Sequence, residues 1–447
     1  MKSLETAAAL CALLTAAPVF AQHQGHDMGG MTMPAPAPAP APSPAGHQGH
    51  DMPGMPMPLG GSAQPHGMTG ALGAYPAARE ASGTAWQPDS SGHGGVHLMA
   101  GDWMLMAHAN LDLVQDWQGG PRGGDKTFLA GMVMGMARRE AGPGTLQFRA
   151  MLSPDPLMGG RGYPLLLAAG ETANGVTPLV DRQHPHDFFM ELSASYSVPL
   201  GNKASAFVYA GLPGEPAFGP PAFMHRMAIA DSPEAPITHH WLDSTHITFG
   251  VVTAGLILGD VKLEASRFNG REPDERRWNI ETGALDSTAL RLSWNPTQNL
   301  SLQVSWAHLV SPEQLEPDEN STRWSASAIY TRRFDTGNWF STTLAWGNRD
   351  GAEAVAAEAG LGLGLWTLYG RAEYAQNDEL EPVLGHHGPR RNVGKLSVGA
   401  IRDLRIAPHL RLGLGAQVTQ NFVPAALEPL YAGDPRGAMA FVRLKLE

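Results

Sequence analysis

The chain has 447 residues and carries 42 acidic against 31 basic side chains, a formal net charge of -11. This balance argues against a nucleic-acid-binding protein, because such proteins neutralise phosphates with lysine and arginine. We therefore expect no nucleic-acid partner. After the first 21 residues, no stretch approaches the roughly 20 continuous apolar residues of a transmembrane helix.

The first 21 residues are predicted to be a secretory signal peptide. Lys2 supplies the positive charge, residues 7–17 form a short apolar run, and Val19-Phe20-Ala21 is a small-residue cleavage pattern. The only cysteine, Cys11, lies in this segment. The mature chain is therefore expected to contain neither disulfides nor thiolate metal sites.

A block of twelve residues occurs twice, at 23–34 and 47–58, and the copies differ at only two positions. Each copy offers two imidazoles, one carboxylate and three thioethers without a core-forming apolar residue. Thioethers favour Cu(I), and imidazole suits copper in either oxidation state, so the repeats predict binding of Cu(I), Cu(II) or both. Silver is the natural mimic, whereas nickel or zinc would leave the methionines unexplained. The predicted tail ligands are His23, His26, Met28, Met31, Met33, His47, His50, Met52, Met55, Met57, His66, Met68, His93, His97 and Met99.

The region that carries these ligands, residues 22–97, is predicted to be a disordered tail. It contains a Pro-Ala run over residues 34–45 and is rich in glycine and proline elsewhere. Such a composition leaves too little apolar burial to offset the entropy of the chain. We expect this segment not to fold alone.

From residue 98 to the end, segments of about ten residues alternate apolar and polar side chains with a period of two, which is typical of strands. In one of them Leu290, Leu292 and Trp294 face one way while Ala289, Arg291 and Ser293 face the other. Sixteen strands are predicted, and merging weak hairpins would leave as few as twelve. They cover residues 99–114, 127–139, 145–153, 187–199, 203–212, 246–258, 260–270, 286–296, 299–309, 321–334, 338–349, 352–361, 364–377, 391–405, 409–421 and 436–446.

Short and long connections alternate between these strands, as in outer-membrane barrels with short periplasmic turns and long outer loops. The predicted fold is thus an all-β, antiparallel, up-and-down outer-membrane barrel over residues 98–447, because a closed sheet pairs every backbone group in lipid. A secreted β-sandwich or propeller is the alternative. In the barrel topology the first strand starts in the periplasm, which predicts a periplasmic tail.

Methionines recur on the first three predicted strands. Met104, Met106 and His108 share the polar face of the first, and neighbouring strands lie about 4.8 Å apart, so these side chains could join others in a thioether track along the lumen. Alternatively, the methionines of the second strand face lipid or fill gaps against an inserted loop. The remaining residues of the predicted track are Met132, Met134, Met136 and Met151.

Two long connections deliver histidines to the predicted outer rim, one before residue 187 and one before residue 247. Imidazoles and a carboxylate in this arrangement indicate either a metal site or a hydrogen-bonded clamp that satisfies buried backbone groups. The residues of this predicted loop site are His184, His186, Asp187, His239, His240 and His246. The pair His386-His387 in another loop is weaker evidence.

No enzymatic activity is predicted. Ser193, Ser195 and Ser197 lie near His186 in the sequence, but no motif joins them to a base and an orienting group, as nucleophilic catalysis requires.

The signal peptide, the repeats at 23–34 and 47–58 and the acidic barrel together resemble the copper-resistance protein B family of outer-membrane proteins. The resemblance rests on this organisation and on the repeats, and the barrel residues contribute no matched motif. It implies copper sequestration or export at the outer membrane of a Gram-negative bacterium.

On this interpretation the tail captures periplasmic copper and holds it near the barrel mouth, where tethering raises its effective concentration to roughly millimolar. The expected partners are outer-membrane lipid, the barrel assembly machinery and a periplasmic copper protein. Two alternatives stay open. One is a general or solute-selective porin with an accessory metal-binding tail, and the other is a plugged barrel that stores metal or assists assembly.

Overall fold

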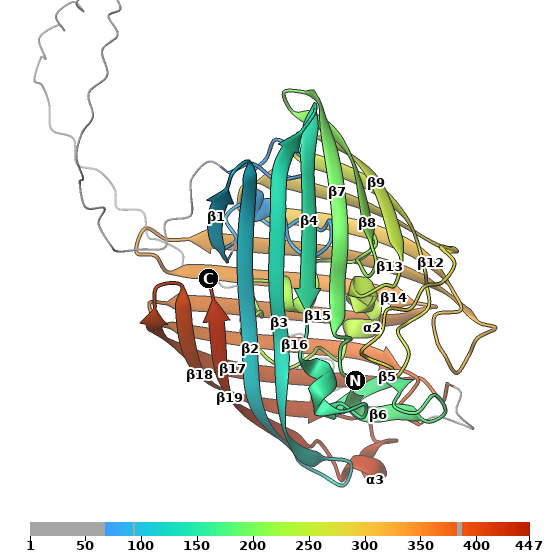
Figure 1. Ribbon diagram of the computed structural model, residues 1–447. Helices are drawn as coiled ribbons and strands as arrows, with labels where there is room; N and C mark the ends of the chain where they lie inside the picture. The colour runs from blue at the N-terminus through green and yellow to red at the C-terminus, as the bar shows by residue number, and fades with distance from the viewer. Residues whose placement is uncertain (1–67, 93, 382–386) are drawn as a thin grey trace, which may run out of the picture. The chain divides into compact units, whose positions relative to one another are not determined.

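The computed structural model describes residues 68–92, 94–381 and 387–447 (Figure 1). The predicted signal peptide, both repeats, His66 and His93 lie outside these residues.

A single closed sheet of sixteen antiparallel strands forms the wall of a barrel (Figure 1). Each strand pairs with its neighbours in chain order, and β19 pairs with β2 to close the sheet. The predicted fold class and strand number are confirmed. The wall strands are β2 (Trp103–Gln118), β3 (Gly124–Ala141), β4 (Gly144–Leu152), β7 (Phe189–Gly201), β8 (Ala204–Gly211), β9 (Val251–Leu258), β10 (Val261–Phe268), β11 (Ser287–Thr297), β12 (Leu300–Val310), β13 (Asn320–Arg333), β14 (Trp339–Arg349), β15 (Ala352–Leu363), β16 (Trp366–Asn377), β17 (Arg391–Ala407), β18 (Leu410–Phe422) and β19 (Arg436–Leu446).

The two faces of the wall have opposite chemistry. In β11, Leu290 and Trp294 are 45% and 48% exposed on the outside, while Arg291 and Ser293 between them are buried inside. An apolar exterior around a polar interior is the arrangement of outer-membrane barrels, and closure leaves no unpaired sheet edge for lipid to meet.

The two ends of the barrel also differ. At one end, here called the short-turn end, tight turns join β3 to β4, β7 to β8 and β9 to β10. At the other, the loop end, lie the long connections after β4 and β8. The predicted alternation holds with two exceptions at the loop end, where residues 119–123 join β2 to β3 and only Asp350 and Gly351 join β14 to β15.

A short strand, β1 (Val96–Ala100), turns back onto β2 at the short-turn end. It pairs with β2 from Trp103 to Ala107, and β19 pairs with the same strand from Ala109 onward. β1 therefore continues the edge of the sheet where β19 stops.

Residues 68–92, assigned by sequence to the tail, pack inside the barrel near the short-turn end. Leu72, Tyr75 and Trp86 bury their side chains against Phe207 and Ile257 of β8 and β9. This segment includes η1 (Ala77–Arg79). Residues predicted to belong to the disordered tail are thus part of the folded barrel from residue 68 onward. The apolar residues within the segment do not predict this packing, because most of the apolar surface that buries Tyr75 and Trp86 belongs to the barrel wall.

Two long connections also enter the barrel. Residues 153–188 carry η2 (Asp155–Met158) and the hairpin of β5 (Tyr163–Thr172) and β6 (Pro178–Gln183). Residues 212–250 carry η3 (Phe223–His225), α2 (His239–Leu242) and η4 (Ser244–His246). The second segment bonds to inner residues of widely separated strands, including Ser305 on β12, Glu358 on β15 and Gln417 on β18. It therefore runs across the interior, where Figure 1 shows α2 behind the front strands.

The remaining helix, α3 (Glu428–Tyr431), lies in the connection before β19. Within the described residues, no helix combines the length and the apolar character needed to cross a membrane.

Candidate functional site

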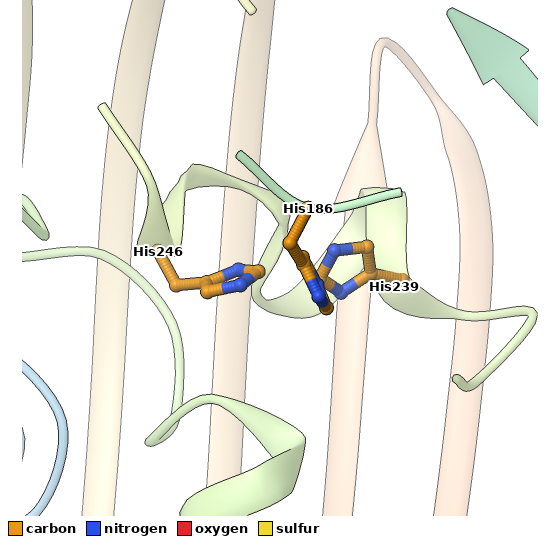
Figure 2. Close-up of side chains that lie close together, drawn as sticks. All are labelled: His186, His239 and His246. Atoms are coloured by element: carbon orange, nitrogen blue, oxygen red, sulfur yellow. The ribbon is translucent and has the colours of Figure 1, made fainter. Parts of the chain in front are cut away.

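Three histidines from the two inserted connections meet inside the barrel. His186 lies just before β7, His239 begins α2, and His246 ends η4. One ring nitrogen of each lies within 4.8 Å of a ring nitrogen of the others. Figure 2 shows the three rings gathered around one point, and all three side chains are buried. We call this group the histidine cluster.

Hydrogen bonds to nearby oxygens orient the three rings. In His239 the Nδ1 atom lies 2.7 Å from Oδ1 of Asp243, one helical turn later, and in His246 it lies 2.8 Å from the backbone oxygen of the same residue. In His186 the Nδ1 atom lies 2.9 Å from Oδ2 of Asp155 in η2. Each Nδ1 therefore faces an oxygen that accepts its proton, which leaves Nε2 as the ring atom available to a ligand.

This pattern is the one found at metal sites, where the ligating imidazole donates its other N–H to a carboxylate or carbonyl. The Nε2 atoms of His186 and His246 are buried and have no hydrogen-bond partner among the described residues. Leaving a buried polar atom unsatisfied costs about 1–3 kcal/mol, so such atoms call for an explanation such as a bound ion.

The charge state of the cluster suits a cation. Burial holds the pKa of His246 well below its usual value, and His239 and His186 lower it further. Neutral imidazole is the form that binds metals. Burial alone would raise the pKa of Asp243, but Arg226 and His239 hold it well below the usual range, so this carboxylate stays charged.

Asp243 is itself fixed to the barrel wall. Arg226 donates to Oδ2 of Asp243 at 2.6 Å and to both carboxylate oxygens of Glu358 on β15 at 2.7 and 2.8 Å. All three side chains are almost completely buried. The ring of Phe223 covers the cluster, stacking on His186 at 6.4 Å between centroids and meeting His239 edge-on at 5.8 Å.

The other predicted loop residues lie beside the cluster and have different partners. His184 contacts Glu171 at 3.2 Å, and His240 lies 3.8 Å from Glu272. Asp187 pairs with Arg277 at 3.1 Å, and burial raises its pKa to about 6. The structure thus brings together three of the six predicted residues. One contact of the hydrogen-bonded clamp is present as well, since His246 donates to the backbone oxygen of Asp243.

The methionines of β2, β3 and β4 all face the interior. Cross-strand partners point to the same face of a sheet, and the register places Met106 opposite Met136, and Met134 opposite both His108 and Met151. Val133, between Met132 and Met134, is 46% exposed outside. The lipid-facing alternative is therefore wrong. Met132 and Met151 pack against Ile247 and Phe249 of the inserted connection, as the gap-filling alternative proposes.

Another group with metal-ligand geometry lies at the loop end, where Glu313, Glu379 and His387 converge. Arg349 already occupies it, contacting Glu379 at 2.6 Å and Glu313 at 3.5 Å. The carboxylate of Asp378, 3.3 Å from Nδ1 of His387, raises the pKa of this histidine to about 9. This group is an ion-pair network with its own cation.

Two of the three serines considered for catalysis have other partners. Ser193 donates to Glu191 at 2.7 Å, and Ser197 donates to the backbone oxygen of Ala71 at 2.6 Å.

Sequence reasoning missed several contributors to this region, among them Phe223, Arg226 and Asp155. Asp155, the partner of His186, sits in a Pro-Asp-Pro turn 31 residues earlier, with no signal that joins them. Met190 and Met224, which join the methionines around Ile247, were missed as well; Met190 lies in a predicted strand at a shift in register, and Met224 lies in a connection.

No family model and no curated protein matches the chain. Solved structures with similar barrels include OmpF of Salmonella typhi in complex with daunomycin, at 9% identity and a TM-score of 0.49, covering 78% of this chain and all of that one. An anion-selective porin from Comamonas acidovorans has 10% identity and a TM-score of 0.46, covering 77% of this chain and all of that one. OmpT of Vibrio cholerae has 7% identity and a TM-score of 0.43, with 78% and full coverage. These values describe a likeness in barrel architecture and not in what the chain binds.

Proposed function

We propose that the protein is an outer-membrane barrel that binds a copper ion at the histidine cluster and receives it from the tail. The observation that carries this proposal is the convergence of His186, His239 and His246, each with its Nδ1 bonded to an oxygen. The apolar exterior of the closed wall supports insertion in the outer membrane.

Copper is proposed because of the thioethers elsewhere in the chain. Three imidazoles suit zinc, nickel or iron as well as copper, but thioethers select copper in its reduced state. The repeats at 23–34 and 47–58 and the interior methionines supply these thioethers. Sequestration is the simplest role for a buried site of this kind, and export would need a path past residues 212–250.

A solute pore is the second candidate, favoured by the porin-like barrel itself. Its interior carries paired charges such as Lys395 and Glu234, 2.5 Å apart, in positions where porins place polar residues. Residues 68–92 and 212–250 lie across this interior and would have to move to open a wide channel. Conductance measurements in planar bilayers separate the candidates, since a large pore indifferent to copper favours a porin.

Metal titration of the full-length protein in detergent tests the main proposal. The double variant H239Q/H246Q should bind one equivalent of Cu(I) fewer than the wild type, because the tail ligands remain. The matched control H409Q removes a histidine from an exposed turn at the short-turn end and should bind the wild-type amount. Equal binding by H239Q/H246Q and the wild type would show that the cluster holds no copper.

A further inference from the structure

The interior methionines of β2, β3 and β4 are arranged in successive levels. Nearest the short-turn end, Met99 of β1 lies opposite Met104. At the next level Met106 lies between His97 and Met136. One level further, Met134 lies between His108 and Met151. Levels are two residues apart, about 6.6–6.8 Å along a strand, and adjacent strands are about 4.8 Å apart.

The last level touches the connection that holds the histidine cluster. Met132 and Met151 form one apolar group with Met190 and with Ile247, the residue after His246. Met224, which packs against this group, follows Phe223, whose ring covers His186 and His239. Thioethers therefore extend from the short-turn end to the edge of the cluster.

Packing alone does not explain this arrangement. Met132, Met151 and Met190 are buried in an apolar group, where methionine is a good gap filler. Met99 is 67% exposed, and Met104 is only partly buried, so neither fills a core. A wet barrel interior ordinarily carries polar side chains at such positions.

The first described residues also lie beside the first level. The backbone oxygen of Thr69 accepts a hydrogen bond of 2.5 Å from Arg138, and Arg138 lies opposite Met104. Met68 precedes this contact. An ion that enters at the short-turn end therefore meets the thioethers of the first level before it meets the histidine cluster.

We infer that these methionines form a relay that admits soft monovalent cations, Cu(I) and Ag(I), from the short-turn end to the histidine cluster. The inference rests on the proposed function of that cluster and adds the oxidation state and the direction of entry. Thioethers bind Cu(I) more strongly than they bind Cu(II) or Zn(II). Soft ions therefore enter through the relay faster than harder ions do. The ion passes from one thioether to the next without a change in oxidation state, and no covalent bond of the protein forms or breaks.

The test measures how fast the full-length protein loads the histidine cluster. Cu(I) or Ag(I) is mixed with the protein, and loosely held metal is removed at intervals with a chelator. The metal bound by the histidine cluster is the amount that remains on the protein minus the amount that remains on H239Q/H246Q. In M134L/M136L this equivalent should be reached about tenfold more slowly, a barrier higher by about 1.4 kcal/mol. The final amount should equal that of the wild type, because the histidines are intact.

Two controls make the result specific. M439L removes a buried interior methionine on β19, outside the relay, and should load at the wild-type rate. Cu(II) should load M134L/M136L and the wild type equally. M99L/M104L should also load Cu(I) slowly. Because these two methionines are not buried in a core, slow loading of this variant would reflect a change in transfer and not in folding.

The two proposals fail in different ways. Wild-type loading rates in both double methionine variants, with the His-dependent equivalent present, would overturn the relay and leave the metal site standing. If the wild type binds no more metal than H239Q/H246Q, both proposals fail, because the relay would then lead to no metal site.

Discussion

Two sectors of the same barrel wall use their interior positions in different ways. In the methionine sector, β2 to β4, thioethers occupy successive inward positions. In the ionic sector, β10 to β18, the inward positions carry buried charges, for example Lys262 with Glu264 at 3.2 Å and Arg371 with Glu373 at 3.1 Å. Both sectors face inserted segments, so burial alone does not explain the difference.

The ionic sector holds the inserted connection in place. Arg226 bridges Asp243 to the wall, and Glu234 in the same connection pairs with Lys395 of β17 at 2.5 Å. Buried ion pairs add little net stability, since desolvation offsets their attraction, but removing one partner is costly. These pairs fix where the connection sits, and hence where His239 and His246 lie. The methionine sector also holds inserted segments, through Lys126 of β3 and Arg149 of β4, but its methionines are uncharged and take no part in ion pairs.

Removing one charge from the ionic sector should give the largest effect. R226A leaves Asp243 and Glu358 buried without their common cation, and we expect a loss of about 3–5 kcal/mol in unfolding free energy. M132L changes a buried methionine for a side chain of similar volume and should cost less than about 1.5 kcal/mol. Denaturant titration in detergent or lipid measures both. Comparable losses in the two variants would remove the distinction between the sectors.

A smaller effect should follow from loosening one ring of the cluster. D243N leaves Arg226 paired with Glu358 but weakens the acceptor of His239, and loss of such an outer contact lowers metal affinity by about 10- to 100-fold. Competition with a copper chelator measures the affinity of the His-dependent equivalent. D187N is the matched control, because the carboxylate of Asp187 pairs with Arg277 and accepts no hydrogen bond from the three rings among the described residues. A greater loss in D187N than in D243N would place the metal elsewhere.

The wall could be predicted from the sequence because alternation is a local property. Leu290 and Arg291 point to opposite faces whatever the rest of the chain does, and sixteen such segments with alternating connections define a closed barrel. The strand ends in the structure differ by a few residues from those predicted, as they do after Met99, where a turn separates β1 from β2.

The cluster could be predicted only in part. Histidines before residues 187 and 247 indicate a site, but nothing local distinguishes His186 from His184 or His239 from His240. His239 joins the cluster because the turn of α2 pairs it with Asp243, and His186 joins it because Asp155 from another segment bonds its ring. The packing of residues 68–92 was missed for a similar reason, since Trp86 and Tyr75 find their apolar partners on β8 and β9 and not nearby in the chain.

The most direct test of a metal site inside the barrel is anomalous diffraction at the copper edge from crystals of the full-length protein grown with Cu(I). We expect a peak among the rings of His186, His239 and His246, and no peak there in crystals of H239Q/H246Q. A copper-loaded crystal with ordered rings and no density between them would contradict it.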